Sequence, residues 1–343
     1  MLDFDSDLEN CSNGKRRPAM RVLVNGYGNI GGTIVALLQR YQQLLGITEI
    51  HVLKNKPNPW DDQVLTDLSE SGVNLHVSKP LEDIINHVDF VFDSTANGGA
   101  LKNKACYENA SHLLGCVSQG SETGFGVPFM GGVNDRVIAD QKFVQVVSCN
   151  THAILALLKK YSGGNLRQIE NSDFVMVRRS EDIGGHERLV NALVVARHRD
   201  ENGTHHAVDA RRLLNTIGVD LPITSSDITT PAQLMHGVRF NITTSQPCEQ
   251  SQETLIASTA FFDSNKLFEL GRRKGFEGRL LNHAIVVDNN LLWEDKNVKG
   301  WAFIPQEGNT ILSTIQAFLI QTHHVGVNGV MSQLGKDLVR QRY

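Results

Sequence analysis

A cysteine stands at the point where a predicted buried strand meets a predicted helix. The apolar run Phe143–Val147 predicts the strand, and Ala153–Tyr161 has the apolar pattern of a helix. Between them lies the stretch Ser148–Thr151, which contains Cys149. Free N–H groups and the positive dipole end of a helix N-terminus favour an anion, so a cysteine placed there is favoured as a thiolate nucleophile. The alternative is a small buried apolar cysteine at the end of a strand.

A glycine-rich turn follows the first buried strand of the chain. Arg21–Asn25 predict that strand, the stretch Gly26–Gly31 has the pattern GxGxxG, and Thr33–Leu45 carries apolar residues at helical spacing. Strand, GxGxxG and amphipathic helix in this order are typical of dinucleotide binding. The glycines allow a tight turn, close approach of a pyrophosphate and close packing of helix on strand. A glycine turn with a purely structural role is the alternative.

The end of the next predicted strand, at residues 49–53, bears on the choice of cofactor. A site selective for NAD usually has Asp or Glu about 20 residues past the glycine motif, where it meets the adenosine ribose. The chain has the stretch Lys54–Pro57 there, which contains Lys54, Asn55 and Lys56. Two cations without a carboxylate suit a 2′-phosphate, so we predict NADP, with NAD possible. The alternative is a pair of solvated loop lysines.

Length and composition bound the class of protein. The chain has 343 residues, enough for two domains with separate cores. Its formal net charge of −4 gives no reason to expect nucleic acid or an anionic membrane as a partner. Five cysteines without a CxxC pair fit a reducing compartment and predict neither a disulfide framework nor a metal site. No apolar run approaches the ~20 residues of a membrane span, so we expect a cytoplasmic protein.

Strands and helices alternate along the first 149 residues, and long strands without that alternation follow. The first pattern predicts a parallel, doubly wound sheet and the second a mixed or antiparallel one. We therefore predict an α/β protein with an N-terminal Rossmann-type domain (20–149) and a C-terminal α+β catalytic domain (150–306). A flexible tail (1–19) and C-terminal helices that pack back on the Rossmann domain (307–343) complete it. Within the second domain we expect a polar loop at 204–209, a helix at 210–217 and a hairpin at 285–293.

A series of short motifs, each different, extends along nearly the whole ordered chain. They are Val24–Gly31, Lys54–Pro57, Asp93–Thr95 with Lys102-Asn103, Gln119-Gly120, Val146–Thr151, Val177–Arg179, Asn191-Ala192, His205-His206 with Asp209, Met235-His236 and Gln306-Glu307. In joint order and spacing they resemble the archaeal-type (type II) glyceraldehyde-3-phosphate dehydrogenases. Each motif is short, and only Ser148–Thr151 is specific by itself.

The resemblance implies a chemistry and a role for each matching residue. Cys149 would attack an aldehyde, His236 would deprotonate the hemithioacetal, and hydride would pass to the nicotinamide. Inorganic phosphate would release the acyl group from the thioester, and in reverse an acyl phosphate would be reduced. With the residues singled out above, the cofactor set is Gly26, Gly28, Asn29, Ile30, Gly31, Lys54, Asn55, Lys56, Gln119, Gly120, Arg179 and Gln306. The set for the phosphorylated aldehyde is Ser148, Asn150, Thr151, Arg178, His205, His206 and Ala207. The family also implies a homotetramer.

The chain departs from the family pattern on the substrate side. The family sequence Cys-Asn-Thr-Thr-Gly is replaced at Cys149–Ala153, where His152 stands for the second threonine. His-His-Gly-Pro-Asp is replaced at His205–Asp209, and Gly-Pro-Ile-Asn-Ala at Arg188–Ala192. The residues for aldehyde oxidation are therefore present, while the identity of the aldehyde stays open.

Other interpretations of these residues remain. Without the resemblance, His236 is a structural histidine, Arg178-Arg179 a surface pair, and His205-His206 part of a metal site that lacks a third nearby ligand. The protein as a whole has two alternatives. One is a related acyl-phosphate or aldehyde reductase of a specialised pathway with a different substrate. The other is a non-catalytic NADP-binding regulatory protein.

Overall fold

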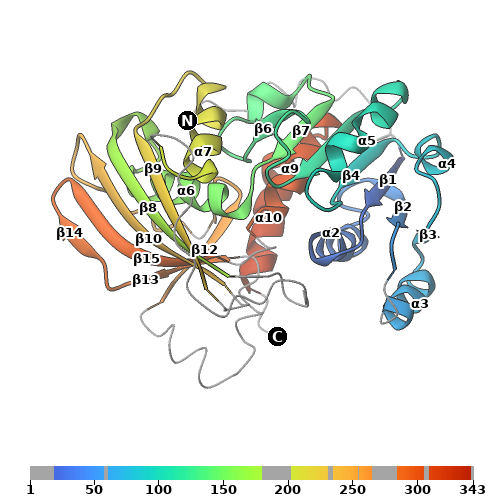
Figure 1. Cartoon of the computed structure of the whole chain (residues 1–343), viewed down its shortest axis with the longest axis horizontal. Helices are drawn as coiled ribbons and strands as arrows, with labels where there is room; N and C mark the ends of the chain where they lie inside the picture. The colour runs from blue at the N-terminus through green and yellow to red at the C-terminus, as the bar shows by residue number, and fades with distance from the viewer. Residues whose placement is uncertain are drawn as a thin grey trace. The chain divides into compact units, whose positions relative to one another are not determined.

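The computed structural model describes residues 19–57, 61–179, 202–230, 235–253, 255–264, 284–304 and 309–340 (Figure 1). The predicted tail up to residue 18, Asn191-Ala192 and Gln306 lie outside these ranges, as does the side chain of Arg179. The chain forms two compact units. Unit 1 comprises Met1–Phe129, Asp135–Val146 and Thr314–Met331, and unit 2 comprises Met130–Asn134, Val147–Ser313 and Ser332–Tyr343. The domain ranges drawn from the sequence stay a prediction.

Unit 1 is built on a seven-stranded sheet in which every pairing is parallel. The order of the strands is β3-β2-β1-β4-β5-β7-β6, so the sequence of strands reverses direction beside β1. The strands are β1 (Met20–Asn25), β2 (Ile47–Lys54), β3 (Asn74–Val77), β4 (Phe90–Asp93), β5 (Gly115–Gln119), β6 (Val127–Phe129) and β7 (Phe143–Val146). A doubly wound parallel sheet binds ligands at the carboxyl ends of its strands, beside such a reversal. The predicted Rossmann-type sheet is confirmed.

Helices cover both faces of this sheet, which is why its central strands read as continuous apolar runs. Side chains of successive strand residues point to opposite faces. Phe90 and Phe92 of β4 contact Phe318 from one face, with ring centroids 4.9 and 5.6 Å apart. From the other face, the hydroxyl of Tyr107 donates to Asp93 at 2.6 Å. The helices of unit 1 are α2 (Asn29–Arg40), α3 (Asp62–Glu70), α4 (Glu82–Ile85) and α5 (Gly99–Asn109), with parts of α9 (Ile311–Gln321) and α10 (Val327–Arg340).

Unit 2 contains an eight-stranded mixed sheet of order β11-β12-β13-β15-β10-β8-β9, with β14 paired to β15. The pairs β8–β9 and β12–β13 are parallel and the remaining pairs antiparallel. The strands are β8 (Ile169–Arg179), β9 (Ile223–Thr230), β10 (His236–Thr244), β11 (Leu255–Ile256), β12 (Thr259–Ser264), β13 (Ala284–Asp288), β14 (Leu292–Glu294) and β15 (Asn297–Ile304). The prediction of an α+β second domain with a mixed or antiparallel sheet is confirmed.

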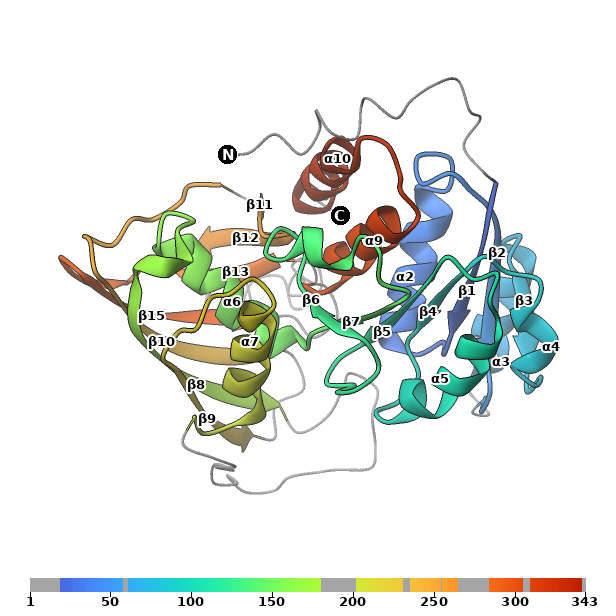
Figure 2. The same cartoon turned by 90° about the horizontal axis from the view of Figure 1, so that it is seen from above.

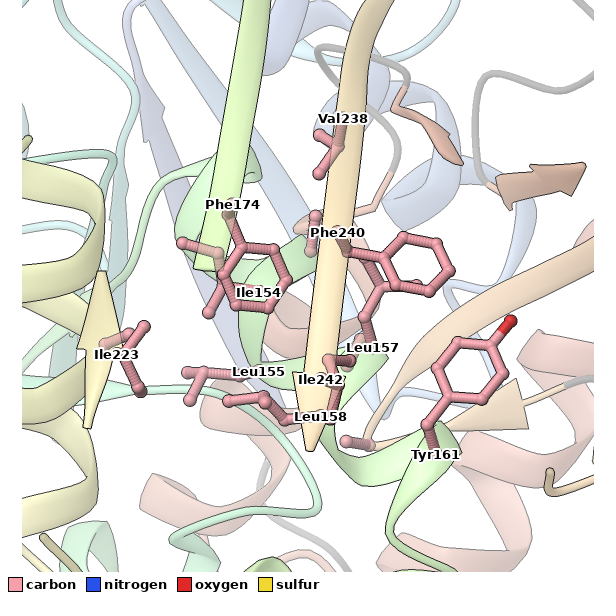
Figure 3. Close-up of a cluster of buried hydrophobic side chains, with 14 of the residues drawn as sticks. Ile154, Leu155, Leu157, Leu158, Tyr161, Phe174, Ile223, Val238, Phe240 and Ile242 are labelled. Atoms are coloured by element: carbon pink, nitrogen blue, oxygen red, sulfur yellow. The ribbon is translucent and has the colours of Figure 1, made fainter. Parts of the chain in front are cut away.

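Two helices, α6 (Cys149–Tyr161) and α7 (His205–Asn215), lie side by side on this sheet (Figure 2). The side chains of α6 interdigitate with those of β8, β9 and β10 in one apolar core (Figure 3). Tyr161 stacks on Phe240 of β10 with ring centroids 5.2 Å apart. The mixed sheet therefore serves as the platform that positions both helices.

The predicted loop at 204–209 is wrong, because α7 begins at His205 with Thr204 at its N-cap position. The polar residues at the start of α7 make its helical pattern hard to recognise in the sequence. His206, Ala210 and Leu213 are all buried on one face of α7, at spacings of four and three residues. A buried histidine looks polar in a sequence but here belongs to the packed side of the helix.

The predicted hairpin at 285–293 is also wrong. β13 and β14 do not pair with each other, and each pairs with β15. The expected turn exists, since Asp288 Oδ1 accepts from the N–H of Asn290 at 2.9 Å. A turn signal locates a change of direction but carries no information on which strands pair afterwards.

Two glycines of the GxGxxG turn differ in the space around them, and this yields a test. A Cβ added at Gly31 would collide with the carbonyl oxygen of Gly26, whereas nothing lies within 4 Å of a Cβ added at Gly28. We expect Gly31→Ala to lower the free energy of unfolding by about 1–3 kcal/mol, because the turn has to open. Gly28→Ala, the matched control, should stay within about 0.5 kcal/mol. Urea denaturation of the full chain measures both, and equal stability of the two variants would contradict the tight turn.

Candidate active site

Cys149 is the first residue of α6 and is partly buried against the core of unit 2. The Oγ of Ser148 accepts from the N–H of Thr151 at 3.4 Å and lies 3.0 Å from its hydroxyl, so these two residues form the helix cap. The carbonyl oxygen of Cys149 accepts from Nδ2 of Asn309 at 2.8 Å. These contacts hold the cysteine where the N-terminal N–H groups of α6 favour negative charge.

The start of α7 lies beside the start of α6. Nδ2 of Asn150 and Nε2 of His206 are 3.3 Å apart, and both side chains are buried. The ring centroids of His205 and His206 are 3.9 Å apart. The N–H of Ala207 donates to Oγ of Ser225 on β9 at 3.2 Å. Two helix N-termini therefore converge on one place, and their dipoles reinforce one another toward an anion.

His236 is a buried residue that begins β10, paired with Ile304 of β15. In Figure 3 the labelled residues of α6, from Ile154 to Tyr161, follow one another in the same direction as Val238, Phe240 and Ile242 of β10. The starts of the two elements, Cys149 and His236, therefore lie at the same end of unit 2. The predicted nucleophile and the predicted base are thus the first residues of two elements that pack against each other in the core of unit 2.

Arg178 lies near the end of β8 and forms an ion pair with a residue of the neighbouring strand β9. Its Nη1 lies 3.2 Å from Oδ2 of Asp227, whose side chain is almost fully buried. Asp227 and Ser225 point to the same face of β9, because strand side chains alternate. Ser225 contacts the start of α7, so Arg178 and the His205-His206 pair occupy one region. Nε of Arg178 is buried without a hydrogen-bond partner among the described residues.

His152 takes a part in this region that the sequence did not predict. It is fully buried, and its Nδ1 lies 3.0 Å from the carbonyl oxygen of Val147. Nε2 lies 2.8 Å from Oγ of Ser313, which in turn accepts from the N–H of Gly131 at 3.0 Å. Since a carbonyl only accepts, Nδ1 carries the proton and Nε2 accepts from the serine hydroxyl. Burial lowers the pKa of His152 to about 4, so the ring is neutral at neutral pH.

The place of His152 in the sequence contained a signal. A histidine directly before the apolar run Ala153–Leu158 of a predicted helix has to find buried hydrogen-bond partners. Its partners Val147 and Ser313 are respectively five residues before it and 161 residues after it. The second partner lies too far along the chain for any local pattern to reveal.

Most of the residues predicted to hold the cofactor lie around the carboxyl ends of β1, β2 and β5 in unit 1, whereas Arg179 ends β8 of unit 2. Gly26 has φ +99°, and a Cβ there would lie 2.8 Å from the backbone of Ser94. No side chain caps α2, whose N-cap residue is Gly28, so the turn exposes a helix N-terminus of the kind that binds pyrophosphate. Gly120 has φ +81° after β5, and the side chain of Gln119 donates to Thr314 at 2.8 Å. The glycine turn fits a dinucleotide.

The two lysines after β2 differ in their surroundings. Nζ of Lys54 donates to the carbonyl oxygen of Tyr27 at 3.1 Å and lies 2.9 Å from Oδ2 of Asp61. Asn55 and Lys56 are exposed. The sequence pattern placed no carboxylate here, and Asp61 supplies one from the start of α3.

In the part of the chain that the structure describes, no three or more His, Cys, Asp or Glu residues are grouped so that they could hold a metal ion. Among the same residues, no helix is both long and apolar enough to cross a membrane.

The chain combines a parallel sheet that carries a GxGxxG turn with a separate mixed sheet that carries a cysteine at a helix start. No family model matches the chain. The chain is 28% identical to glyceraldehyde-3-phosphate dehydrogenase of Metallosphaera sedula over 258 residues, which cover 70% of this chain and 71% of that protein. It is 25% identical to the enzyme of the same name from Saccharolobus islandicus over 332 residues, which cover 88% and 92%.

A solved structure matches almost throughout. Aspartate semialdehyde dehydrogenase II from Vibrio cholerae aligns with a TM-score of 0.59 at 12% identity, over 95% of this chain and all of that one. At this identity the match shows the fold. Together the comparisons confirm the resemblance to the archaeal-type glyceraldehyde-3-phosphate dehydrogenases. The curated relatives indicate an oxidoreductase, and dehydrogenases of their kind use a nicotinamide cofactor.

The buried His152 predicts a pH dependence of stability. Its folded pKa of about 4 lies below the ordinary 6.5, so the unfolded chain binds the proton more readily between these values. The contribution of the neutral His152 ring to the free energy of unfolding is therefore fully present above pH 6.5, and it is lost as the pH falls toward 4. Between pH 7.5 and 5 the free energy of unfolding should therefore fall by about 2 kcal/mol less in His152→Gln than in the wild type. Urea denaturation at both pH values measures it, and identical losses in both proteins would contradict a buried neutral ring.

Proposed function

We propose that the chain is a phosphorylating NAD(P)-dependent aldehyde dehydrogenase that oxidises glyceraldehyde-3-phosphate or a related phosphorylated aldehyde through a Cys149 thioester. In the reverse direction it reduces an acyl phosphate. The observation that carries the proposal is the place of Cys149, the first residue of α6, where the starts of α6 and α7 and the side chain of Asn309 meet. The resemblance to dehydrogenases of this kind supports it.

The proposed reaction assigns steps to residues at this end of unit 2. Sγ of Cys149, as a thiolate, adds to the aldehyde carbon, and the carbonyl oxygen takes a proton from water to become the hydroxyl of a hemithioacetal. His236 removes the proton of that hydroxyl, because hydride leaves far more readily from an alkoxide-like carbon. A dinucleotide held at the glycine turn between β1 and α2 would supply the acceptor for the hydride. An oxygen of inorganic phosphate then attacks the thioester carbon, and the thiolate of Cys149 leaves with the C–S bonding pair.

Binding of the phosphate groups is proposed for the region around Arg178, His205 and His206. Arginine suits phosphate because its planar fork donates parallel hydrogen bonds, and a helix N-terminus adds N–H donors. Asp227 holds one end of the Arg178 guanidinium and so orients the rest of it. The unfilled Nε of Arg178 is a donor that a bound oxyanion would satisfy.

NADP is the proposed preference, with NAD accepted, because Lys54 ends β2 and Lys56 follows it, where the adenosine ribose is expected. A panel of phosphorylated and unphosphorylated aldehydes, each run with NAD and NADP and with and without phosphate, tests the whole proposal. Turnover of a phosphorylated aldehyde that requires phosphate supports it. Binding of NADPH without turnover on any aldehyde would instead favour the non-catalytic protein.

Cys149 is expected to be necessary for turnover. Cys149→Ser should lower kcat by about 10³-fold or more while nucleotide binding stays within twofold, because a serine hydroxyl is a far weaker nucleophile without further activation. Cys248→Ser is the matched control in the same unit. Burial raises the pKa of Cys248, so we expect iodoacetamide at neutral pH to label Cys149 first. Activity of Cys149→Ser near that of the wild type would exclude the thioester.

Arg178 is expected to contribute to phosphate binding. Arg178→Ala should raise the apparent KM for inorganic phosphate about tenfold or more, the value of one charge-assisted contact, with a smaller change in kcat. Arg167→Ala is the control, because this arginine of unit 2 is exposed and donates to the carbonyl oxygen of Gly218. Steady-state kinetics at varied phosphate measure both. If turnover ignores phosphate altogether, water or another acceptor takes the acyl group.

A further inference from the structure

A largely buried ion pair lies at the carboxyl edge of the parallel sheet in unit 1. Nζ of Lys54, on the last residue of β2, is 2.9 Å from Oδ2 of Asp61, and the two side chains are only 15% and 20% exposed. The same ammonium donates to the carbonyl oxygen of Tyr27 at 3.1 Å. Tyr27 belongs to the GxGxxG turn. The ion pair therefore joins the end of β2, the glycine turn and the residue that precedes α3.

This position coincides with the place where a doubly wound sheet meets the adenosine ribose. β1 and β2 are adjacent and parallel, with Asn25 opposite Leu53, and the N–H of Gly26 donates to the carbonyl oxygen of Leu53 at 2.9 Å. The residue that ends the second strand of this fold lies beside the ribose 2′ position. Lys54 is thus the cation that a 2′-phosphate would meet first.

Asp61 weakens the attraction that Lys54 would exert on a 2′-phosphate. At this low exposure the attraction between Lys54 and Asp61 is screened less than a surface pair is. A 2′-phosphate that approaches Lys54 has to compete with the carboxylate for the ammonium, and it is also repelled by that carboxylate. A 2′-hydroxyl carries no charge and meets neither cost. Lys56 is exposed, so its attraction is weakened by water and salt.

Helix capping does not account for the carboxylate. Asp61 stands at the N-cap position of α3, yet its side chain makes no cap hydrogen bond. The adjacent Asp62, which is exposed, already provides negative charge in the first turn of α3. The Asp61 carboxylate instead contacts Lys54, at the expected ribose region.

We propose that Asp61 is a specificity residue that restrains recognition of the 2′-phosphate by Lys54, so that the protein accepts NAD as well as NADP. The inference rests on the dinucleotide site of the proposed function and deepens it. Lys54 alone would select strongly for NADP. The pair of Lys54 and Asp61 reduces that selectivity.

The test uses two small ligands that differ only in the 2′-phosphate, adenosine 2′,5′-bisphosphate and adenosine 5′-monophosphate, titrated calorimetrically into the full chain. In Asp61→Asn the affinity for the bisphosphate should rise about tenfold, while that for the monophosphate stays within twofold, because the amide no longer neutralises Lys54. Asp62→Asn is the matched control, with the same loss of charge one residue away, and should leave both affinities within twofold. Asp61→Glu keeps the charge and should keep the wild-type ratio within about threefold.

A double-mutant cycle assigns the effect to the pair. In a Lys54→Met background, Asp61→Asn should change the ratio of the two affinities much less than it does beside Lys54. An unchanged or lowered preference for the bisphosphate in Asp61→Asn overturns this inference and leaves the dinucleotide site standing. If the wild type binds neither ligand, the dinucleotide site of the proposed function fails and this inference fails with it.

Discussion

Burial of α6 against the mixed sheet is the constraint on which the candidate site depends. Residues 150–158 of this helix are all buried, so it has no solvent face along most of its length. A helix packed on every side is held in place, because close-packed interiors resist even small changes of volume. The polar contacts of Asn309, His152 and Asn150 then attach the starts of α9 and α7 to the same end of the helix. Apolar packing fixes the helix, and hydrogen bonds at its start arrange the chemistry.

The sequence predicted the features whose signals are local and strong. The glycine turn between β1 and α2 and the cysteine at the start of α6 lie where those signals placed them. The start of α7 was missed because His206 is polar by type and buried by position. The pairing of β14 was missed because strand partners are set by the whole sheet. The partner of His152 on α9 lies far along the chain, and the assignment of the remaining site residues to ligands stays a prediction.

Two of the cations predicted to bind anions have acidic partners that the sequence did not connect with them. Arg178 pairs with Asp227 from a parallel neighbouring strand, and Lys54 pairs with Asp61 from the start of the next helix. Strand pairing and chain reversal bring these carboxylates in, and neither is visible as a motif. A cation in such a pair is positioned but partly neutralised. Counting lysines and arginines therefore overestimates the positive charge that a site offers to phosphate.

The absence of a solvent face on α6 has a consequence for hydrogen exchange. Backbone amides of a buried, hydrogen-bonded helix exchange with solvent only when the surrounding structure opens as a whole. Most of α6 is in that position, whereas its first residue, Cys149, is only partly buried. The sulfur of Cys149, the proposed nucleophile, thus lies at the less buried end of what should be the slowest-exchanging segment of unit 2. A partly exposed side chain and a rigid backbone, which often exclude each other in a protein, are here found at adjacent residues of one helix.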